Sequence, residues 1–194
     1  MNRLLIISSA TLVMAASVNG QDGEALVKGE IKNERRQESV IKQEIKEERK
    51  ELRKLEGKEV SYMSRQVFTA DFGKIPVSKW ERTAYYDEAT FTLNGQTLKA
   101  YYDADFKLVG TTSHKTFADL PANAQKYIDA KYQGYSRGDV LLFDDDELNT
   151  TDMVMFGTQF DDADNYFIDL KKDNREIIVR VNMSGDVSFF KQPR

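Results

Sequence analysis

The stretch FTADFGKIPVSKW, residues 68–80, has a counterpart in FADLPANAQKYI, residues 117–128. Each copy places an aromatic residue before an Asp, an apolar residue and a Pro, and a run of strand-like segments follows each copy. Because Pro suits the first turn of a helix, we expect a short helix from Pro76 and a second one from Pro121 to about Gln133. A duplicated unit of one helix and one antiparallel meander predicts a single curved sheet with helices on one face.

Alternating apolar and polar side chains mark the strands that follow each copy. Residues 85–93 alternate in this way and lead into Asn94-Gly95, a strong hairpin signal since both residues accept the positive φ of a type I′ turn. The return strand directs Leu98, Ala100 and Tyr102 inward, and a third strand starts at Lys107. Later strands are expected near residues 139–143, 153–160, 165–171, 175–182 and 186–191. The predicted class is therefore α+β.

The N-terminal segment, residues 1–20, has the three parts of a signal peptide. Arg3 precedes an apolar stretch from Leu4 to Ala16, and small residues lie just before Gln21. The stretch is shorter than the roughly 20 residues that cross a bilayer, so we expect cleavage and no membrane span in the mature chain. We therefore expect a soluble periplasmic or secreted protein.

The composition limits which kinds of partner the protein can bind and which interactions can stabilise its fold. The chain has no Cys, so no disulfide assists its core and no cysteine is available for a lipid anchor. The formal net charge is −4, and −5 without Arg3, which argues against a nucleic-acid partner. The aromatic residues are concentrated in residues 60–194, which we expect to form one domain with repeat units of about 62–114 and 115–192.

Residues 21–59 form a segment dense in Glu, Lys and Arg, with a long charged helix expected over 24–56. The helix should end at Gly57, a suitable C′ residue. Its seam is apolar at Ile41, Ile45, Leu52 and Leu55 and is interrupted by Glu48. Two interpretations remain open: a solvated helical spacer, or self-association, in which a facing helix relieves repulsion between like charges at four-residue spacing.

Several motifs resemble the PepSY-like, β-lactamase-inhibitor-like family of exported bacterial proteins. They are Asp71-Phe72, Pro76 to Trp80, Ala89-Thr90-Phe91, Asn94-Gly95 and Ala100-Tyr101-Tyr102-Asp103. The segment from Asp119-Leu120-Pro121 through Ile128, with Tyr132 and Gly134-Tyr135, resembles the family's linking helix. The resemblance covers about residues 62–192. It implies two tandem helix-plus-meander units in one curved sheet and a location outside the cytoplasm. The family often has Gly where this chain has Phe106.

Residues that could carry catalysis are few. One His and no Cys exclude the usual zinc sets and thiol nucleophiles, and no local motif makes His114 part of a catalytic triad. The acidic runs 144–147 and 161–164 lack the spacing of an EF-hand loop, and no phosphate-binding Gly-rich loop occurs. We predict no catalytic residue, no metal site and no cofactor; an unrecognised hydrolase or a calcium-binding protein remains an alternative.

Four adjacent aromatic pairs fall on predicted strands, where neighbouring side chains point to opposite faces. The aliphatic pattern directs one set toward the core: Tyr85, Tyr102, Tyr166 and Phe189, with Ile168, Leu170, Ile177, Val179 and Val187. The other set is expected on the open face that the helices do not cover: Tyr86, Tyr101, Phe167, Phe190, Lys99, Ile178 and Arg180.

An exposed aromatic patch with Arg is typical of a binding surface. We therefore predict an exported, non-enzymatic binding module that grips an envelope protein or peptide through this face, enzyme inhibition being one form of such binding. Coverage of the face by the charged helix or by a second copy, and simple stabilisation of the sheet by cross-strand aromatic pairs, are the other interpretations. The alternative function is a structural protein that assembles through residues 24–56.

Overall fold

The computed structural model describes residues 20–193, so residues 1–19 of the predicted signal peptide lie outside the described part. The chain forms two compact units, one ending at Lys46 and one beginning at Glu47. Helix α1 (Gly20–Glu56) contributes to both units. It ends before Gly57, which has φ +87°, as the sequence predicts.

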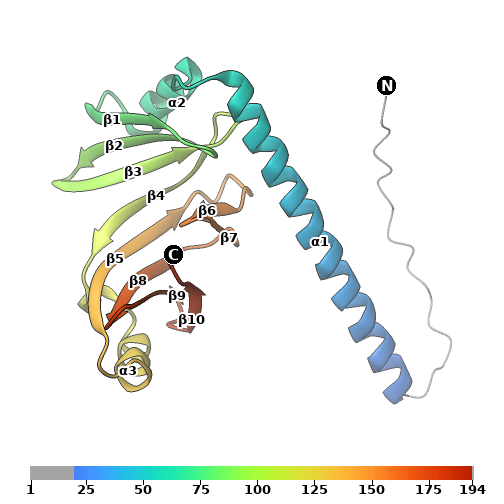
Figure 1. The fold of residues 1–194 in the computed structure, drawn as a ribbon. Coiled ribbons are helices and arrows are strands. Elements are labelled where there is room, and N and C mark those ends of the chain that lie inside the picture. The colour runs from blue at the N-terminus through green and yellow to red at the C-terminus, as the bar shows by residue number, and fades with distance from the viewer. Residues whose placement is uncertain (1–19, 194) are drawn as a thin grey trace, which may run out of the picture. The chain divides into compact units, whose positions relative to one another are not determined.

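The unit that begins at Glu47 contains the last turns of α1 and all of the sheet. Its further elements are α2 (Tyr62–Phe72), β1 (Val77–Arg82), β2 (Asp87–Leu93), β3 (Gln96–Tyr102), β4 (Leu108–Lys115), η1 (Phe117–Asp119), α3 (Ala122–Lys131), β5 (Ser136–Asp145), β6 (Met153–Met155), β7 (Thr158–Phe160), β8 (Asn165–Lys172), β9 (Arg175–Asn182) and β10 (Val187–Lys191). Within the described residues, eight strands form one antiparallel sheet in the order β1-β2-β3-β4-β5-β8-β9-β10, and β6 pairs with β7 separately (Figure 1). The α+β class is confirmed.

The order of elements repeats along this unit. Helix α2 precedes β1 to β4, and helix α3 precedes β5, β8, β9 and β10, so each half supplies one helix and four consecutive strands of the sheet. The β6–β7 hairpin is an additional element between the first and second strands of the second half. The two tandem helix-plus-meander units thus lie side by side in a single curved sheet (Figure 1).

The helix of the first half lies before Pro76, so the predicted helix that starts at Pro76 is wrong. Helix α2 begins after Ser61, whose Oγ accepts a hydrogen bond from the Met63 backbone N–H, and it ends at Gly73 with φ +80°. Pro76 directly precedes the edge strand β1, where the missing N–H removes no ladder hydrogen bond. The aromatic residues of the motif still meet, since the Phe68 and Trp80 ring centroids are 5.5 Å apart.

Helices α2 and α3 pack on the same face of the sheet. Under α2 the buried residues are Phe68, Ala89, Phe91, Ala100 and Tyr102. Under α3 they are Leu120, Ala124, Ile128, Val140, Tyr166, Ile168, Leu170, Ile177, Val179 and Val181. The predicted inward register is confirmed for Tyr102, Tyr166 and the aliphatic residues of β8 and β9.

Two aromatic residues of the predicted inward set lie outside the core under the helices. Tyr85 precedes β2 and packs with the cluster on the opposite face, so its predicted direction is wrong. Phe189 pairs with Val179 and therefore points to the predicted face, but it lies on the edge strand β10 and is 58% exposed. Alternation predicts the direction of a strand side chain and not whether another element covers it.

Among the turns that contain a non-glycine residue with positive φ, two bear on the sequence predictions. Asn94 and Gly95 have φ +52° and +80°, which confirms the predicted type I′ hairpin turn. Phe106 has φ +63°, so this turn keeps a left-handed conformation that Gly adopts more easily. The carboxylate of Asp103 holds the turn, since Oδ1 accepts hydrogen bonds from the backbone N–H of Asp105 and Lys107 at 2.9 and 3.0 Å.

A buried ion-pair network around Asp87 joins the last turns of α1 to the sheet. The Asp87 carboxylate has no exposed surface and accepts hydrogen bonds from Arg53 Nη1 at 2.9 Å, Arg82 Nε at 2.7 Å and Ser64 Oγ at 2.7 Å. Burial alone raises the pKa of Asp87, but the hydrogen bonds from Arg82 and Ser64 and the charge of Arg53 outweigh it and leave the pKa below its usual value. The carboxylate is therefore charged at neutral pH.

The Arg53 side chain extends the same network to the end of β3. Its Nη2 donates hydrogen bonds to the backbone carbonyl of Tyr102 at 2.9 Å and to that of Asp103 at 2.6 Å. Arg53 is nearly fully buried although it lies in the most charged segment of the chain. One basic residue of that segment is thus a core residue of the second unit.

Asp87→Asn is expected to lower the free energy of unfolding at pH 7 by about 3–5 kcal/mol, because two buried guanidinium groups lose their counter-charge. Since the pKa of Asp87 is lowered by folding, its contribution is complete above the unfolded value of about 4 and is lost as the pH falls through the folded value. Urea denaturation between pH 7 and pH 3 measures both effects.

The variant should lack this part of the wild-type acid sensitivity. Asp105→Asn, which removes an exposed carboxylate from a turn, is the control and should behave like the wild type. Equal stability of Asp87→Asn and the wild type at pH 7 would contradict the proposed weight of the network.

Candidate functional site

A hairpin covers part of the sheet face opposite α2 and α3, which we call the helix-free face. Residues 153–160, predicted as one strand, form the β6–β7 hairpin around a turn at Phe156-Gly157, with φ +51° and +74°. Its apolar side chains pack against those of the face to make a third buried cluster: Tyr86, Tyr101, Val109, Phe143, Met153, Met155, Phe160, Phe167 and Ile178. The sheet therefore has a packed core on both sides.

The predicted binding residues lie on or beside this face, but most of them are covered. Tyr86, Tyr101, Phe167 and Ile178 are at most 8% exposed, and Phe190, Lys99 and Arg180 are half-buried. The expectation of an exposed aromatic patch is thus wrong for the first four. The physical reason is the hairpin, because Met153, Met155 and Phe160 pack against these four side chains.

A signal for this cover was present in the sequence. Met153, Val154 and Met155 form a short apolar run, and Phe156-Gly157 interrupts the segment before Phe160. A Gly after a run of three strand-like residues is typical of a hairpin turn. The segment could therefore have been assigned as two short strands, although the face on which they pack could not.

Hydrogen bonds to the first half of the unit hold the hairpin in place. The Tyr86 hydroxyl accepts a hydrogen bond from the Val154 backbone N–H at 2.8 Å. Asp103 Oδ2 accepts hydrogen bonds from Asn149 Nδ2 and Thr151 Oγ1, both at 3.3 Å. Burial raises the pKa of Tyr86 well above its usual value, so its hydroxyl stays neutral and serves as a structural partner.

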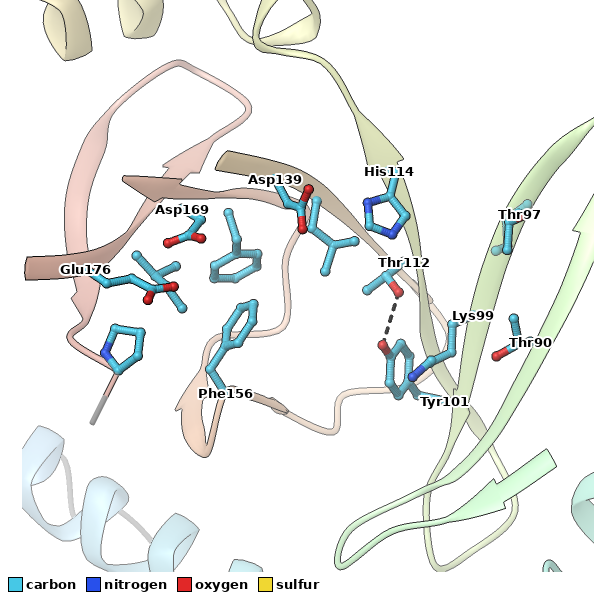
Figure 2. A pocket seen from close by; sticks show the side chains of 15 residues that line it. Thr90, Thr97, Lys99, Tyr101, Thr112, His114, Asp139, Phe156, Asp169 and Glu176 are labelled. Carbon is cyan, nitrogen blue, oxygen red and sulfur yellow. Dashed lines mark hydrogen bonds between the residues drawn. The ribbon is translucent and has the colours of Figure 1, made fainter. Parts of the chain in front are cut away.

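Beside the hairpin, the helix-free face is hollowed into a groove of about 540 Å³ (Figure 2). Its apolar lining consists of Leu98, Tyr101, Leu141, Phe156, Phe167, Ile178 and Pro193. Its polar lining consists of Thr90, Thr97, Lys99, Thr112, His114, Asp139, Asp169 and Glu176. Four of the predicted site residues line the groove, namely Lys99, Tyr101, Phe167 and Ile178; Tyr86, Phe190 and Arg180 are not part of its lining.

At the end of the groove on β3 and β4, the one lysine is paired with a carboxylate and two hydroxyl groups lie within hydrogen-bond distance. Lys99 Nζ lies 2.8 Å from Glu88 Oε2 and 6.0 Å from the centroid of the Tyr101 ring. The Tyr101 hydroxyl and Thr112 Oγ1 are 3.0 Å apart (Figure 2). Burial raises the pKa of Tyr101 to about 12, so its hydroxyl is a neutral hydrogen-bonding group here.

The end of the groove on β5, β8 and β9 is acidic. Lys171 Nζ lies 2.9 Å from Asp169 Oδ2 and 3.3 Å from Glu176 Oε1, and Asp139 is an exposed third carboxylate. Asp169 Oδ1 is buried and accepts no hydrogen bond within residues 20–193. Gly138 leaves room for this carboxylate, since a Cβ at that position would lie 2.9 Å from Asp169 Oδ2.

Phe156 at the tip of the β6–β7 hairpin has an unusual conformation for its size. A left-handed φ of +51° is rare for a bulky residue and costs about 1–3 kcal/mol. The ring is 45% exposed, and its centroid lies 6.0 Å from that of Phe167 and 6.4 Å from that of Phe190. The turn thus presents an aromatic side chain to the groove where Asn would be the easier residue.

A second, smaller hollow of about 320 Å³ has Asp145, Glu147, Asp162 and Asp164 among its lining residues. Burial, together with hydrogen bonding to Asp162 and the charges around it, raises the pKa of Asp145 to about 7. The backbone N–H of Asp145 donates a hydrogen bond to Asp164 Oδ1 at 2.8 Å. Across the described part of the chain, no three His, Asp or Glu side chains are arranged to hold a metal ion.

Asp145→Asn is expected to stabilise the protein at pH 8 and to leave its stability almost unchanged at pH 5. An acid whose pKa is raised by folding loses stability as the pH increases from about 4, its unfolded value, to about 7. Since water screens this half-buried group, we expect about 1 kcal/mol, or a melting temperature about 2–4 °C higher at pH 8. Thermal unfolding at both pH values measures the effect, with Asp161→Asn as the exposed control. A lower melting temperature for Asp145→Asn at pH 8 would refute the assignment.

Solved structures share this fold. A DUF2874 family protein from Bacteroides uniformis superposes with a TM-score of 0.53 and 13% identity, covering 66% of this chain and 85% of that one. A BLIP-like protein from Bacteroides fragilis gives 0.50 and 12%, covering 70% and 86%. A protein from Bacteroides eggerthii described as periplasmic gives 0.54 and 14%, covering 70% and 88%.

These similarities establish the α+β architecture and nothing of the ligand, because the identities are low. The sequence matches no protein-family model, and a comparison with curated proteins finds no match. The description of the Bacteroides fragilis protein agrees with the β-lactamase-inhibitor-like part of the expected resemblance; its PepSY-like part stays a prediction. None of the helices in the described part of the chain is long and apolar enough to cross a membrane.

Proposed function

We propose that this protein is an exported, non-enzymatic binding module that holds a peptide segment of an envelope protein in the groove of the helix-free face. One observation carries the proposal: the groove has an apolar floor, and the adjoining hairpin presents the exposed ring of Phe156 to it from a strained backbone conformation.

The composition of the groove supports a binding role. Its volume of about 540 Å³ lies within the range of ligand sites, which are mainly apolar with a few placed polar groups. Aromatic side chains dominate the centres of protein interfaces. Strain that persists in an exposed aromatic residue is more easily explained by a contact to a ligand than by the stability of the turn.

The chemistry of the lining supports a non-enzymatic role. The hydroxyl of Tyr101 is neutral and hydrogen-bonded to Thr112. The single imidazole, that of His114, is exposed at the rim of the groove. The lining residues include no Ser or Cys that could act as a nucleophile beside that imidazole. Placement of ligand atoms, rather than covalent chemistry, is what these side chains offer.

The proposed location and mode of action have separate support. The signal-peptide pattern of residues 1–20 favours the periplasm or secretion, and a structural neighbour described as periplasmic is consistent with it. The BLIP-like description of another neighbour makes inhibition of an enzyme one form that the binding could take. Each point rests on similarity of fold or on sequence pattern.

Phe156→Asn tests the site with a variant that should fold. The loss of ring contacts is offset by the easier left-handed conformation of Asn, so the free energy of unfolding should change by less than about 1 kcal/mol. Peptides selected from a random displayed library on the wild-type protein should bind the variant at least about tenfold more weakly, as measured by fluorescence anisotropy.

Phe189→Asn is the matched control, because it removes an exposed Phe from the edge strand β10, outside the groove lining. It should bind the selected peptides as the wild type does. Equal binding by all three proteins places the site elsewhere, and a failure to select any peptide contradicts the peptide-binding function.

A second candidate function, structural self-association through α1, is favoured by the apolar stripe of that helix. Val27, Ile31, Ile41 and Ile45 repeat at helical spacing and are between 43% and 55% exposed. Such a stripe is usually covered by a second helix. A second copy of the chain would supply one.

Sedimentation velocity of the mature protein tests self-association through this stripe. If α1 pairs with another α1, the wild type should sediment as a dimer or larger species. The double variant Ile41→Ser, Ile45→Ser should sediment as a monomer, since it removes two apolar layers from the seam. A wild type that is monomeric at all concentrations rules this function out and leaves the solvated-spacer interpretation.

A further inference from the structure

We infer that the acidic end of the groove binds the side chain of a Lys or Arg residue that ends an apolar run in an extended peptide. The inference rests on the proposed function, because it names the ligand chemistry of the same groove. It assigns two roles: charge neutralisation by Asp169 and Glu176, and an aromatic wall formed by Phe156.

The charge balance of the groove favours a cation at this end. Asp139, Asp169 and Glu176 bring three carboxylates to the lining, and Lys171, which bridges two of them, supplies one ammonium group. At the other end Lys99 is already paired with Glu88. The acidic end therefore has negative charge in excess, partly screened from water by its walls.

The carboxylates at this end differ in how far a ligand can reach them. Asp169 Oδ2 lies 2.9 Å from Lys171 Nζ and this side chain is 20% exposed, with Oδ1 buried. Glu176 is 43% exposed, and Asp139 is an exposed carboxylate. A charged donor forms the strongest hydrogen bonds to carboxylates, so the ammonium or guanidinium group of a ligand would bind the exposed oxygens.

Aromatic rings form the wall beside these carboxylates. Phe167 and Asp169 lie two residues apart on β8 and therefore point to the same face, and the Phe156 ring lies 6.0 Å from the Phe167 ring. Figure 2 shows Phe156 on the same side of the groove as Asp169 and Glu176. A cation between a carboxylate and an aromatic face gains from both, and more so when it is partly desolvated.

The apolar floor of the groove determines which residues of the peptide fit beside the basic one. From Asp169 on β8 to Lys99 on β3 the groove crosses three strand spacings, or about 14 Å. That span accommodates about four extended residues. Because Tyr101, Leu141 and Phe167 line it, the fitting occupant has a basic residue followed or preceded by three or four apolar ones.

A set of three synthetic probes tests this inference. They are one fluorescein-labelled peptide with Lys before three Leu residues and two copies in which Nε-acetyl-lysine or Glu replaces the Lys. Fluorescence anisotropy should show binding of the Lys peptide, at least tenfold weaker binding of the acetyl-lysine peptide, and still weaker binding of the Glu peptide. Asp169→Asn and Glu176→Gln should each weaken the Lys peptide at least fivefold and leave the acetyl-lysine peptide unchanged.

The controls separate this inference from the proposed function. Asp105→Asn removes an exposed carboxylate outside the groove and should bind all probes as the wild type does. If the wild type binds the three peptides equally and Phe156→Asn weakens that binding, the cation site is overturned and the groove remains a peptide site. Binding that Phe156→Asn does not affect, or no binding of any probe, overturns both. Urea denaturation of Asp169→Asn confirms that a loss of binding does not come from unfolding.

Discussion

The other parts of the second unit depend on the hydrogen bonds that the buried carboxylate of Asp87 accepts. It accepts hydrogen bonds from Arg53 at the end of α1, from the Ser61 backbone N–H and Ser64 Oγ at the start of α2, and from Arg82 at the end of β1. A charge in this position is tolerable only when its partners surround it. The ends of two helices and one strand are therefore held at the first residue of β2.

Further hydrogen bonds connect the Asp87 network to the groove. Arg53 also binds the backbone carbonyls of Tyr102 and Asp103, and Asp103 in turn binds Asn149 and Thr151 ahead of the β6–β7 hairpin. The hairpin is inserted in the second half of the repeat, yet groups from the first half set its position. The wall of the groove that carries Phe156 is in this way linked to the same buried network as α1.

Both faces of the sheet are packed, and the two packed faces have different roles. The helices bury two clusters on one face, which stabilises a fold shared with proteins only 12–14% identical in sequence. The hairpin buries only part of the other face and leaves the groove beside it. A fold common to such distant proteins does not define a ligand, because the ligand contacts are side chains of an inserted element and of the strand positions next to it.

Local patterns in the sequence determined the elements of this protein: the long charged helix and its end at Gly57, the Asn94-Gly95 turn, and the inward register of β8 and β9. Each of these follows from neighbouring residues, since strand alternation and turn preference act over a few positions. Pro76 marks the limit of that reasoning, because Pro fits the start of a helix and the approach to an edge strand equally well, and only pairing with β2 decides between them.

Tertiary structure alone decided which residues form the candidate site. Whether Tyr101 and Phe167 face water depends on a hairpin that begins 52 residues after Tyr101 and ends seven residues before Phe167. The approach of Phe156 to Asp169 and Glu176, and the pairing of Arg53 with Asp87, likewise join positions separated along the chain. No local pattern encodes such contacts, because burial and charge pairing are properties of the packed chain.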